Sequence, residues 1–384
     1  MRKKLLQLLK GQLALWMSTG STDRQLWIFS STNNTEFNYN SKYLFLYVKE
    51  HFPQVKPRYV VNEPKLRAEL SKKYGAEYFI ETQTLAGMKQ ALRAGVWFTS
   101  AGLPVYAFGS GRKRTIVNLW HGVPLKKIAL LEEHASTLSK LYFRQVFSKN
   151  YKYILTTSTE LVPIMAASFG VKEDKIKVWG QPRNDVILET KDKSLKDICG
   201  KLPAYRKAIL YAPTYRENGE AKLFPFSDVD RKRLGGFLKE KELLLCLRTH
   251  LEEKELCTSY TAERVIDVGA NVIDDISEYL SCFDVLITDY SSIYIDYLLL
   301  DRPMIFLPYD KEEYLSVRGM NFKYEEVTPG EQPETFADFL KALEHALYAD
   351  TFAGERKRVN SRFNEVQKPC CQYICETIYE MEEQ

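Results

Sequence analysis

The sequence lacks several signatures that would place it in a common functional class. None of its apolar runs reaches the roughly 20 residues that a membrane-spanning helix needs. No small-residue cleavage site follows the N-terminus, so a secretory signal peptide is not expected. The chain also has no GxxxxGK[ST] loop and no GxGxxG after a strand pattern, which disfavours a Walker-type ATPase and a nicotinamide-dependent enzyme.

Charge and cysteine content exclude further classes. The net charge is only +4, too small to indicate nucleic-acid binding. The seven cysteines are irregularly spaced, and Cys370, Cys371 and Cys375 form the one close group. A CC-x3-C group without a second pair is a poor pattern for a metal, so we expect reduced thiols in a cytosolic protein and no metal site.

What the chain does have is length, an ordinary composition and a regular alternation of patterns. Its 384 residues suffice for two domains, and 45% hydrophobic residues allow a sizeable core. Short apolar runs alternate with amphipathic stretches, which predicts parallel sheets covered by helices on both faces. The expected strands are Gln25–Ser30, Arg58–Val61, Glu77–Ile80, Val96–Thr99, Thr115–Trp120, Tyr153–Thr156, Ala208–Tyr211, Leu243–Leu247, Val265–Asp267, Val285–Thr288 and Met304–Leu307. The expected helices between them include Asn40–His51, Thr82–Ala94, Thr159–Phe169, Ser227–Glu240, Asp274–Ser281 and Ile293–Leu300.

A polar stretch divides this alternation into two halves. The pattern restarts at Ala208 after Lys191–Lys207, which contains Gly200 and Pro203. We therefore expect an α/β fold with two Rossmann-like, doubly wound domains, residues 1–190 and 191–384, facing each other as in the GT-B architecture of glycosyltransferases. The last segments, Phe336–Tyr348 and Gly354–Glu383, are expected to be helical. In that architecture the final helix often crosses back onto the first domain.

The first sixteen residues combine early cations with leucines and Trp16. This composition favours a short amphipathic helix that lies on an anionic membrane surface. The alternative is a terminal helix that packs on its own domain.

Candidate functional residues follow the expected strands, because ligands of open α/β sheets bind beyond the carboxyl ends of the strands. After Thr115–Trp120 comes His121-Gly-Val-Pro-Leu-Lys126-Lys127. The imidazole can accept a proton near neutral pH, and the lysines can hold phosphate. The alternative for His121 is a capping or core histidine.

Two further strand ends carry cations and hydroxyls. Ala208–Tyr211 is followed by Ala-Pro-Thr214-Tyr-Arg216, and Leu243–Leu247 is followed by Arg248-Thr-His250. Guanidinium and hydroxyl groups at these places are typical of a phosphate grip. Solvated loops are the alternative for each one taken alone.

A third strand end, after Val285–Thr288, reads Asp289-Tyr-Ser291-Ser292 and leads into an apolar helix. Either serine is a natural N-cap, and the free amides of a helix start favour an anion such as pyrophosphate. Plain capping is the alternative, but it leaves Asp289 unexplained.

Two loops outside these strand ends also carry cations. Gly180-Gln-Pro-Arg183-Asn184-Asp185 closes the first half, where Arg183 and Asn184 could meet a ligand. Gly109-Ser-Gly-Arg-Lys-Arg114 is a basic loop that either faces phosphate or is simply solvated.

Together these motifs resemble the CDP-glycerol glycerophosphotransferase family, which builds wall teichoic acid and some capsules. The resemblance rests on LWHGVPLKK, GQPRND, YAPTYRE, LRTH and DVGANVIDDISEYLSCFDVLITDYSSIYIDY, in this order, from about Thr115 to Pro308. The chain length is closer to that of primase-type members than to that of the longer polymerases. The segment before Thr115 carries no recognised motif.

The resemblance implies roles for the matching positions. His121 would be the base that activates an acceptor hydroxyl, and Arg248 and the catalytic His250 would hold and neutralise the donor phosphates. Thr214, Arg216, Ser291 and Ser292 would bind the pyrophosphate, Asp289 would orient this loop, and Arg183, Asn184 and Lys126 are candidate contacts in the cleft. The acceptor would be an undecaprenyl-linked saccharide or teichoic acid, which implies peripheral attachment to the cytoplasmic face of the membrane. No cofactor is firmly expected, although a loosely bound Mg²⁺ is left open.

Three alternatives remain at this point. CDP-ribitol could replace CDP-glycerol without any change in the phosphate motifs. A nucleotide-sugar glycosyltransferase could use the same GT-B fold, although no convincing carboxylate pair marks a sugar site. A non-catalytic scaffold of a wall-polymer assembly would not need His121, His250 and the Ser291-Ser292 turn together.

Overall fold

The chain folds as an α/β protein with two parallel sheets. The computed structural model describes residues 2–18, 20–189, 193–214, 216, 222–249 and 254–383. His250, one of the two predicted catalytic histidines, lies outside these residues.

Two compact units divide the chain. The first contains the residues up to Asp185 and those from Glu365 onwards, and the second contains Val186–Asn364. The boundary expected between residues 190 and 191 falls in a segment that the structure does not describe. The last helix, α16 (Cys371–Glu383), belongs to the first unit.

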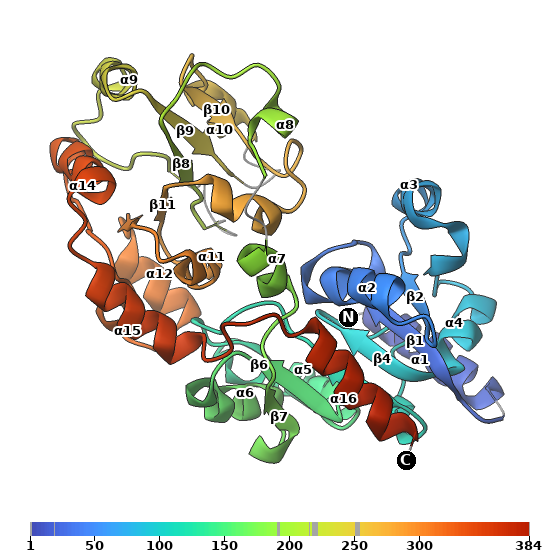
Figure 1. Ribbon diagram of the computed structural model, residues 1–384. Coiled ribbons are helices and arrows are strands. Elements are labelled where there is room, and N and C mark those ends of the chain that lie inside the picture. Colours follow the sequence, from blue (N-terminus) through green and yellow to red (C-terminus); the bar gives the residue numbers. More distant parts are fainter. Residues whose placement is uncertain are drawn as a thin grey trace. The chain divides into compact units, whose positions relative to one another are not determined.

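The first unit is built on a parallel sheet of seven strands (Figure 1). Their order is β3 (Phe79–Ile80), β2 (Lys56–Val60), β1 (Asp23–Ser30), β4 (Ala94–Thr99), β5 (Thr115–Asn118), β6 (Tyr153–Thr156) and β7 (Ile176–Val178). Every strand expected in this half is present, with shifts of a few residues at the ends. Strand β7 was missed because lysines flank and interrupt its short apolar run, Lys175-Ile-Lys177-Val.

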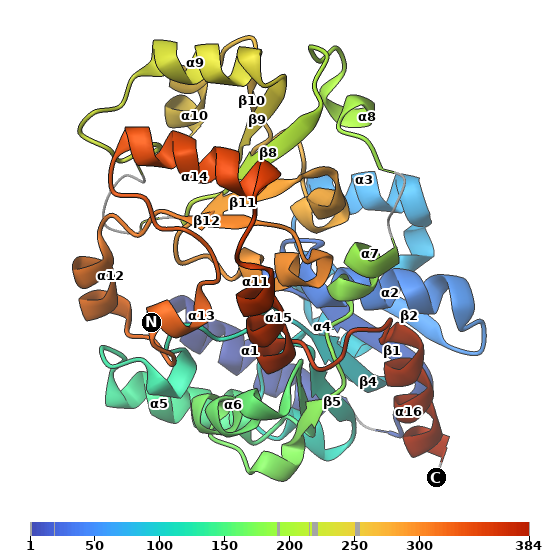
Figure 2. The same ribbon diagram turned by 60° about the vertical axis from the view of Figure 1, so that its left-hand side comes forward.

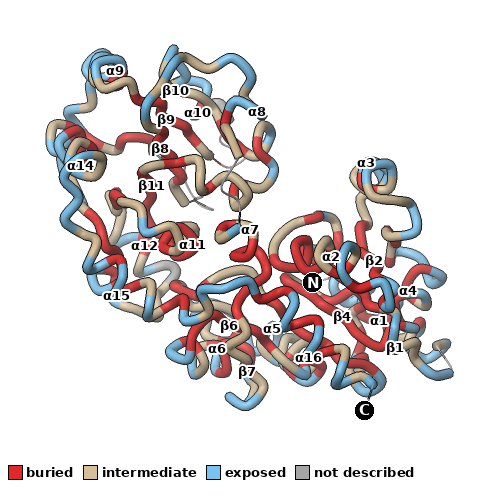
Figure 3. The backbone as a smooth tube through the Cα atoms, viewed as in Figure 1, coloured by how far each residue is buried: buried red, intermediate tan, exposed pale blue. Residues whose placement is uncertain are grey.

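Helices bury both faces of this sheet. On one face α2 (Tyr39–His51), α3 (Pro64–Tyr74) and α16 pack against the side chains of β1, β2, β4 and β5 in one apolar cluster. On the other face Trp97 of β4 donates a hydrogen bond to Ala91 O of α4 (Leu85–Leu92), and α1 (Arg2–Met17) packs on α4. Strands β4 and β5 are therefore buried along their whole length, as Figure 3 shows for β4, and β1 is buried over its second half. Such two-sided burial is typical of parallel sheets.

The second unit is built on a parallel sheet of five strands, in the order β10 (Val265–Asp267), β9 (Leu243–Leu247), β8 (Lys207–Tyr211), β11 (Val285–Thr288) and β12 (Met304–Phe306). One apolar cluster joins the strands to α9 (Arg231–Glu240) and α14 (Phe336–Tyr348). Figure 2 shows α14 in front of this sheet. The other helices of the chain are α5 (Thr137–Phe143), α6 (Val162–Phe169), α7 (Arg183–Glu189), α8 (Lys196–Cys199), α10 (Lys254–Tyr260), α11 (Ile293–Tyr297), α12 (Lys311–Arg318), α13 (Tyr324–Val327) and α15 (Ala353–Phe363).

Two segments expected to be helical show details that the sequence did not give. The segment expected at Asp274–Ser281 is a 3₁₀ helix, Ile276–Cys282. The segment Gly354–Glu383 is helical as expected and contains two helices, α15 and α16. Pro369 lies in the break, where it cannot donate a backbone hydrogen bond, and Asn364 donates its side-chain amide to Ile295 O instead of continuing the helix.

Each sheet has a switch point, where the strand order reverses direction. In the first unit it lies between β1 and β4, and in the second between β8 and β11. Loops on the two sides of a switch point diverge and leave room for a ligand at the carboxyl edge of the sheet. The predicted site residues should therefore be sought at these two places.

Candidate active site

His121 lies at the carboxyl edge of the first sheet, three residues after β5. Trp120 before it has a φ of 52° and Gly122 after it a φ of 150°, so the chain turns sharply on both sides of the histidine. The imidazole Nδ1 lies 2.9 Å from Ser100 O, which follows β4. The rings of Tyr39 and Trp120 lie against the imidazole, with centroid distances of 4.9 and 3.9 Å. These contacts fix the ring in one orientation.

This surrounding also fixes the protonation state of His121. A carbonyl oxygen can only accept, so Nδ1 carries the proton and the neutral ring keeps its lone pair on Nε2. Burial lowers the pKa of His121 to about 4; the bond to Ser100 O opposes this shift, and the Arg183 cation adds to it. At neutral pH the imidazole is therefore an unprotonated base.

The GQPRND segment supports the His121 loop through hydrogen bonds. Arg183 Nη1 donates to His121 O at 2.7 Å, and Arg183 N donates to Asn40 Oδ1 at 3.1 Å. Asn40 in turn donates its side-chain amide to the carbonyls of Leu119 and Trp120. Asn40, at the start of α2, was missed by the sequence analysis because it stands alone and far from the motif that it supports.

Arg183 and Asn184, predicted as candidate cleft contacts, are buried with exposed fractions of 7% and 3%. Asn184 Oδ1 accepts a hydrogen bond from Gln181. The next residue, Asp185, accepts from the backbone amides of Cys370 and Cys371 at 2.8 Å each and so caps the start of α16. In this structure the segment therefore braces His121 and anchors the last helix.

The two lysines after His121 are both half-buried, and Lys127 forms an ion pair with Glu133. Lys126 is the one predicted from the sequence as a candidate contact, and that prediction stays untested.

Asp289 organises the switch point of the second sheet. Its Oδ1 accepts from Thr214 N at 2.8 Å, Thr214 Oγ1 at 2.6 Å and Tyr290 N at 2.6 Å. Its Oδ2 accepts from Arg216 Nη2 at 2.8 Å. The carboxylate is only 2% exposed and joins the loop after β8 to the loop after β11. This arrangement is consistent with the orienting role suggested for Asp289.

Arg216 is bound by two carboxylates. Besides Asp289, it contacts Asp310, with Nε at 2.8 Å from Oδ2 and Nη2 at 3.1 Å from Oδ1, and its Nη1 donates to Thr214 O. Burial lowers the pKa of Arg216, but the two carboxylates outweigh this effect and the net shift raises it. At most one N–H, on Nη1, is left for a ligand. One guanidinium faces two carboxylates, so the group carries a net negative charge.

Tyrosines enclose this ion-pair network. The Arg216 guanidinium lies over the rings of Tyr290, Tyr309 and Tyr314, 4.8–5.4 Å from their centroids. Tyr290 also donates its hydroxyl to Asp310 at 2.9 Å. Asp310 was missed by the sequence analysis, although it lies shortly after β12, where the strand-end rule used for the other loops would have found it.

Arg248 stabilises a neighbouring loop. Its Nη1 donates to Val268 O at 2.9 Å and Ile273 O at 2.7 Å, and its Nη2 lies 3.3 Å from Asp274 O. Burial lowers the pKa of Arg248, while Asp275 and Asp274 oppose that shift. Several N–H groups of Arg248, which was predicted to bind phosphate, are therefore already bonded to backbone carbonyls.

The serine turn differs from the predicted cap. Ser292 occupies the N-cap position of α11 but makes no capping hydrogen bond with its side chain, and α11 has only five residues. Ser291 Oγ is 3.5 Å from Ile293 N, which is a weak contact. Both hydroxyls are therefore little used by the helix.

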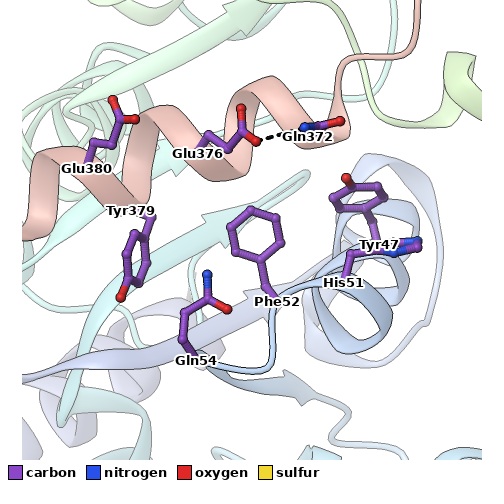
Figure 4. A pocket seen from close by; sticks show the side chains of 8 residues that line it. All are labelled: Tyr47, His51, Phe52, Gln54, Gln372, Glu376, Tyr379 and Glu380. Atoms are coloured by element: carbon purple, nitrogen blue, oxygen red, sulfur yellow. Dashed lines mark hydrogen bonds between the residues drawn. The ribbon is translucent and has the colours of Figure 1, made fainter.

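Hollows of about 380 and 510 Å³ in the structure are lined by other residues. One of about 380 Å³ opens between α2 and α16 and is lined by side chains such as Tyr47, His51 and Glu376 (Figure 4). It contains none of the predicted site residues. Among the residues that the structure describes, no group of three His, Cys, Asp or Glu side chains could hold a metal ion.

Comparisons with known proteins agree with these motifs. The chain is 28% identical to the teichoic acid poly(glycerol phosphate) polymerase of Bacillus subtilis (strain 168), over 91% of the chain and 48% of that protein. It is 27% identical to the teichoic acid glycerol-phosphate transferase of Staphylococcus aureus (strain NCTC 8325 / PS 47), over 93% of both. It is also 25% identical to the teichoic acid ribitol-phosphate polymerase TarL of the same organism, over 64% of the chain and 44% of that protein. The chain thus spans about half the length of the two polymerases.

The fold is also that of a solved relative. The wall teichoic acid polymerase TagF superposes with a TM-score of 0.77 at 21% identity, covering 97% of this chain and 93% of that one. A TagF variant has also been solved after a soak with CDPG. This likeness shows a GT-B-like fold. Residues 13–380 match the profile of the CDP-Glycerol:Poly(glycerophosphate) glycerophosphotransferase family, so the chain belongs to that family of transferases.

Proposed function

We propose that this protein transfers glycerol phosphate from CDP-glycerol to a hydroxyl of a lipid-linked acceptor in teichoic acid or capsule synthesis, releasing CMP. The observation that carries this proposal is the unprotonated Nε2 of His121 at the carboxyl edge of the first sheet. The match to the staphylococcal glycerol-phosphate transferase over nearly the whole of both chains supports it.

In the proposed reaction His121 Nε2 accepts the proton of the acceptor hydroxyl. The hydroxyl oxygen forms a bond to the β-phosphorus of CDP-glycerol, and the bond from that phosphorus to the bridging oxygen breaks. CMP departs with the electron pair of that bond. Such phosphoryl transfers depend mainly on positioning and on neutralisation of charge. The contacts of His121 with Ser100 O and with the rings of Tyr39 and Trp120 would supply the positioning.

The second unit is proposed to hold the donor at its own switch point. The Ser291 and Ser292 hydroxyls, which the helix uses little, would donate to the pyrophosphate. Thr214 and Arg216 would contribute from the opposite loop, and Arg248 would keep the neighbouring loop in place while its remaining N–H groups face the phosphates. His250 keeps its proposed role of neutralising the leaving phosphate.

CDP-ribitol is the second candidate donor, because ribitol-phosphate polymerases are among the relatives at similar identity. The decisive experiment measures CMP release from CDP-glycerol and CDP-ribitol, and nucleotide release from UDP-sugars, each with a lipid-linked disaccharide analogue. We expect turnover with CDP-glycerol only. Turnover with CDP-ribitol alone would replace the donor, and turnover with a UDP-sugar would refute the reaction class. No turnover with any of them would refute the enzyme proposal for this chain.

The exposed face of α1 supports peripheral attachment to an anionic membrane. Leu8 and Ala14 point inward and are buried, while Leu5, Leu9, Leu13 and Trp16 are exposed, Trp16 to 82%. No helix among the described residues is long and apolar enough to cross a membrane. The helix packs on its own unit, and it also presents exposed apolar side chains with Lys4 and Lys10 beside them, which supports the proposed attachment.

Vesicle sedimentation tests this attachment. Leu9→Gln combined with Trp16→Gln should reduce binding to vesicles that contain phosphatidylglycerol by roughly ten-fold or more, because two large apolar groups leave the interface. The matched control is Gln7→Ser, an exposed change on the same helix that removes no apolar group. Equal binding of all three proteins would place any membrane contact elsewhere.

A further inference from the structure

Three buried serines meet where α2 packs on β1 and β4 (Figure 1). They are Ser30 at the end of β1, Ser41 in the first turn of α2 and Ser100 just after β4, and each has an exposed fraction of 0%. Burying a hydroxyl lowers stability unless it is hydrogen-bonded, so packing alone would favour alanine at these places. Their position beside the His121 loop suggests that the hydroxyls serve the site.

The hydrogen bonds among the three serines run in one direction. Ser41 Oγ donates to Ser30 O at 2.7 Å, which uses its single hydroxyl proton. Ser100 Oγ lies 2.8 Å from Ser41 Oγ and must therefore be the donor of that pair. Ser100 Oγ also accepts from Ser41 N at 2.9 Å. Two hydrogen bonds to Ser41 thus fix the side chain of Ser100.

Ser100 in turn presents the carbonyl that faces His121 Nδ1 at 2.9 Å. This carbonyl belongs to the peptide between Ser100 and Ala101, beyond the end of β4 at Thr99. If that peptide turned over, the Ala101 N–H would face the imidazole instead. Nδ1 would then have to accept, and the proton would move to Nε2. The ring would lose the lone pair that is proposed to take the acceptor proton.

We propose that Ser41 is a positioning residue: by holding Ser100 it keeps the Ser100 carbonyl on His121 Nδ1 and so maintains the tautomer with an unprotonated Nε2. The inference rests on the proposed role of His121 as the base. Because the partner of Nδ1 is a neutral carbonyl and not a carboxylate, its direction alone selects the tautomer. Ser41 itself touches no reacting atom and acts through Ser100.

The two residues before Ser41 act on the same loop. Tyr39 has a φ of 55°, which is uncommon for a bulky residue, and its ring stacks on that of His121. Asn40 donates to the carbonyls of Leu119 and Trp120. Three successive residues at the start of α2 therefore contact the segments around the base, and a strained backbone of this kind persists where the surrounding structure holds it in place.

The tautomer of His121 is the primary readout. It can be measured at neutral pH by nitrogen NMR with isotope-labelled histidine, and His121→Gln identifies the signals of His121 among those of the five histidines. We expect the proton on Nδ1 in the wild type and a clear share of the Nε2-protonated form in Ser41→Ala. Ser168→Ala is the matched control, since it removes an equally buried hydroxyl that has no partner among the described residues. An unchanged tautomer in Ser41→Ala would overturn the proposal.

Turnover, measured as CMP release, is the second readout. Ser41→Ala should lower kcat by about ten-fold or more and change KM for the donor by less than about two-fold, because the donor is assigned to the second unit. A loss confined to KM would overturn the proposal. If the wild type releases no CMP, the proposed function fails, while the tautomer measurement still decides on Ser41.

Ser100→Ala keeps the test decisive if Ser41→Ala does not fold. It breaks the same hydroxyl pair from the other side and leaves α2 unchanged, so it should shift the tautomer in the same direction. The double variant should lose no more turnover than about either single variant, because both remove one shared interaction. Losses that simply add would show that the two serines act separately and would overturn the proposal.

Discussion

His121 in one unit and Arg216 in the other both follow a strand at the carboxyl edge of a parallel sheet, but their surroundings differ. His121 is held by a backbone carbonyl and two aromatic rings, and the nearby charge that acts on it is the Arg183 cation. Arg216 is held by the carboxylates of Asp289 and Asp310. The first arrangement lowers the pKa of His121 and leaves the lone pair on its Nε2. The second neutralises the Arg216 cation and occupies most of its N–H groups.

Under the proposed function, this difference would separate two tasks, proton abstraction and phosphate binding. A base must be ready before the acceptor arrives, so its protonation state is set by fixed contacts. A phosphate grip that is closed by its own carboxylates must exchange partners when the donor binds, or act indirectly by shaping the loop. The predictions below test this distinction, from the largest expected effect to the smallest.

The largest effect is expected for His121→Ala. Removing the base should lower turnover by about 10²–10⁴-fold, the range for general acid–base groups. Binding of CDP-glycerol, measured by calorimetric titration, should change little, because the donor is assigned to the second unit. His134→Ala, which removes an exposed histidine of the same unit, serves as the control. Near-normal turnover of His121→Ala would end the assignment of His121 as the base.

The carboxylates around Arg216 should have opposite effects on donor binding. Asp289→Asn places an amide against the guanidinium and disrupts the Thr214 loop, so we expect a loss of roughly 2–4 kcal/mol in the free energy of unfolding and about ten-fold weaker donor binding. Asp310→Asn should tighten donor binding by about three-fold, because it removes one competing charge and one acceptor of Arg216. Urea denaturation and calorimetric titration of CDP-glycerol measure both quantities. Weaker binding in both variants would show that Arg216 needs both carboxylates and does not exchange partners.

The pH dependence should reveal the lowered pKa of His121. In kcat/KM, which reports the free enzyme, the acidic limb assigned to His121 should lie near pH 4 rather than near 6.5. The unfolded chain takes up a proton on this histidine below about pH 6.5 and the folded chain does not. The contribution of His121 to folding stability is therefore present above that pH and is lost as the pH falls towards 4. An acidic limb near pH 6.5 that disappears in His121→Gln would contradict the model of a base kept neutral by burial.

The smallest effect is expected for Ser292→Ala. Its hydroxyl makes no capping bond, so the melting temperature should stay within about 1 °C of the wild type, in contrast to the loss of a true N-cap. The affinity for CDP-glycerol should fall by about five- to ten-fold if the hydroxyl donates to a phosphate. A drop in melting temperature without a change in affinity would reverse this assignment and make Ser292 a structural residue.

Much of the site was predictable from sequence, because strand ends are local features. An apolar run followed by a polar, turn-forming segment marks where a buried strand meets the edge of the sheet. This rule placed His121, Thr214, Arg216, Arg248 and Asp289 at the carboxyl edges where the structure has them. The same local patterns gave every strand except β7.

The tertiary structure alone decided which of these side chains meet and with which partners. The sequence shows that His121 follows a strand, but only the pairing of β4 with β5 brings Ser100 O to its Nδ1. It shows a cation at Arg216, but only the position of β12 beside β11 brings Asp310 to it. Asp185 meets α16 across 185 residues of chain in the same way. Periodicity and turn chemistry act over a few residues and can be read from the sequence, whereas strand order and long-range hydrogen bonds are set by the packing of the whole sheet.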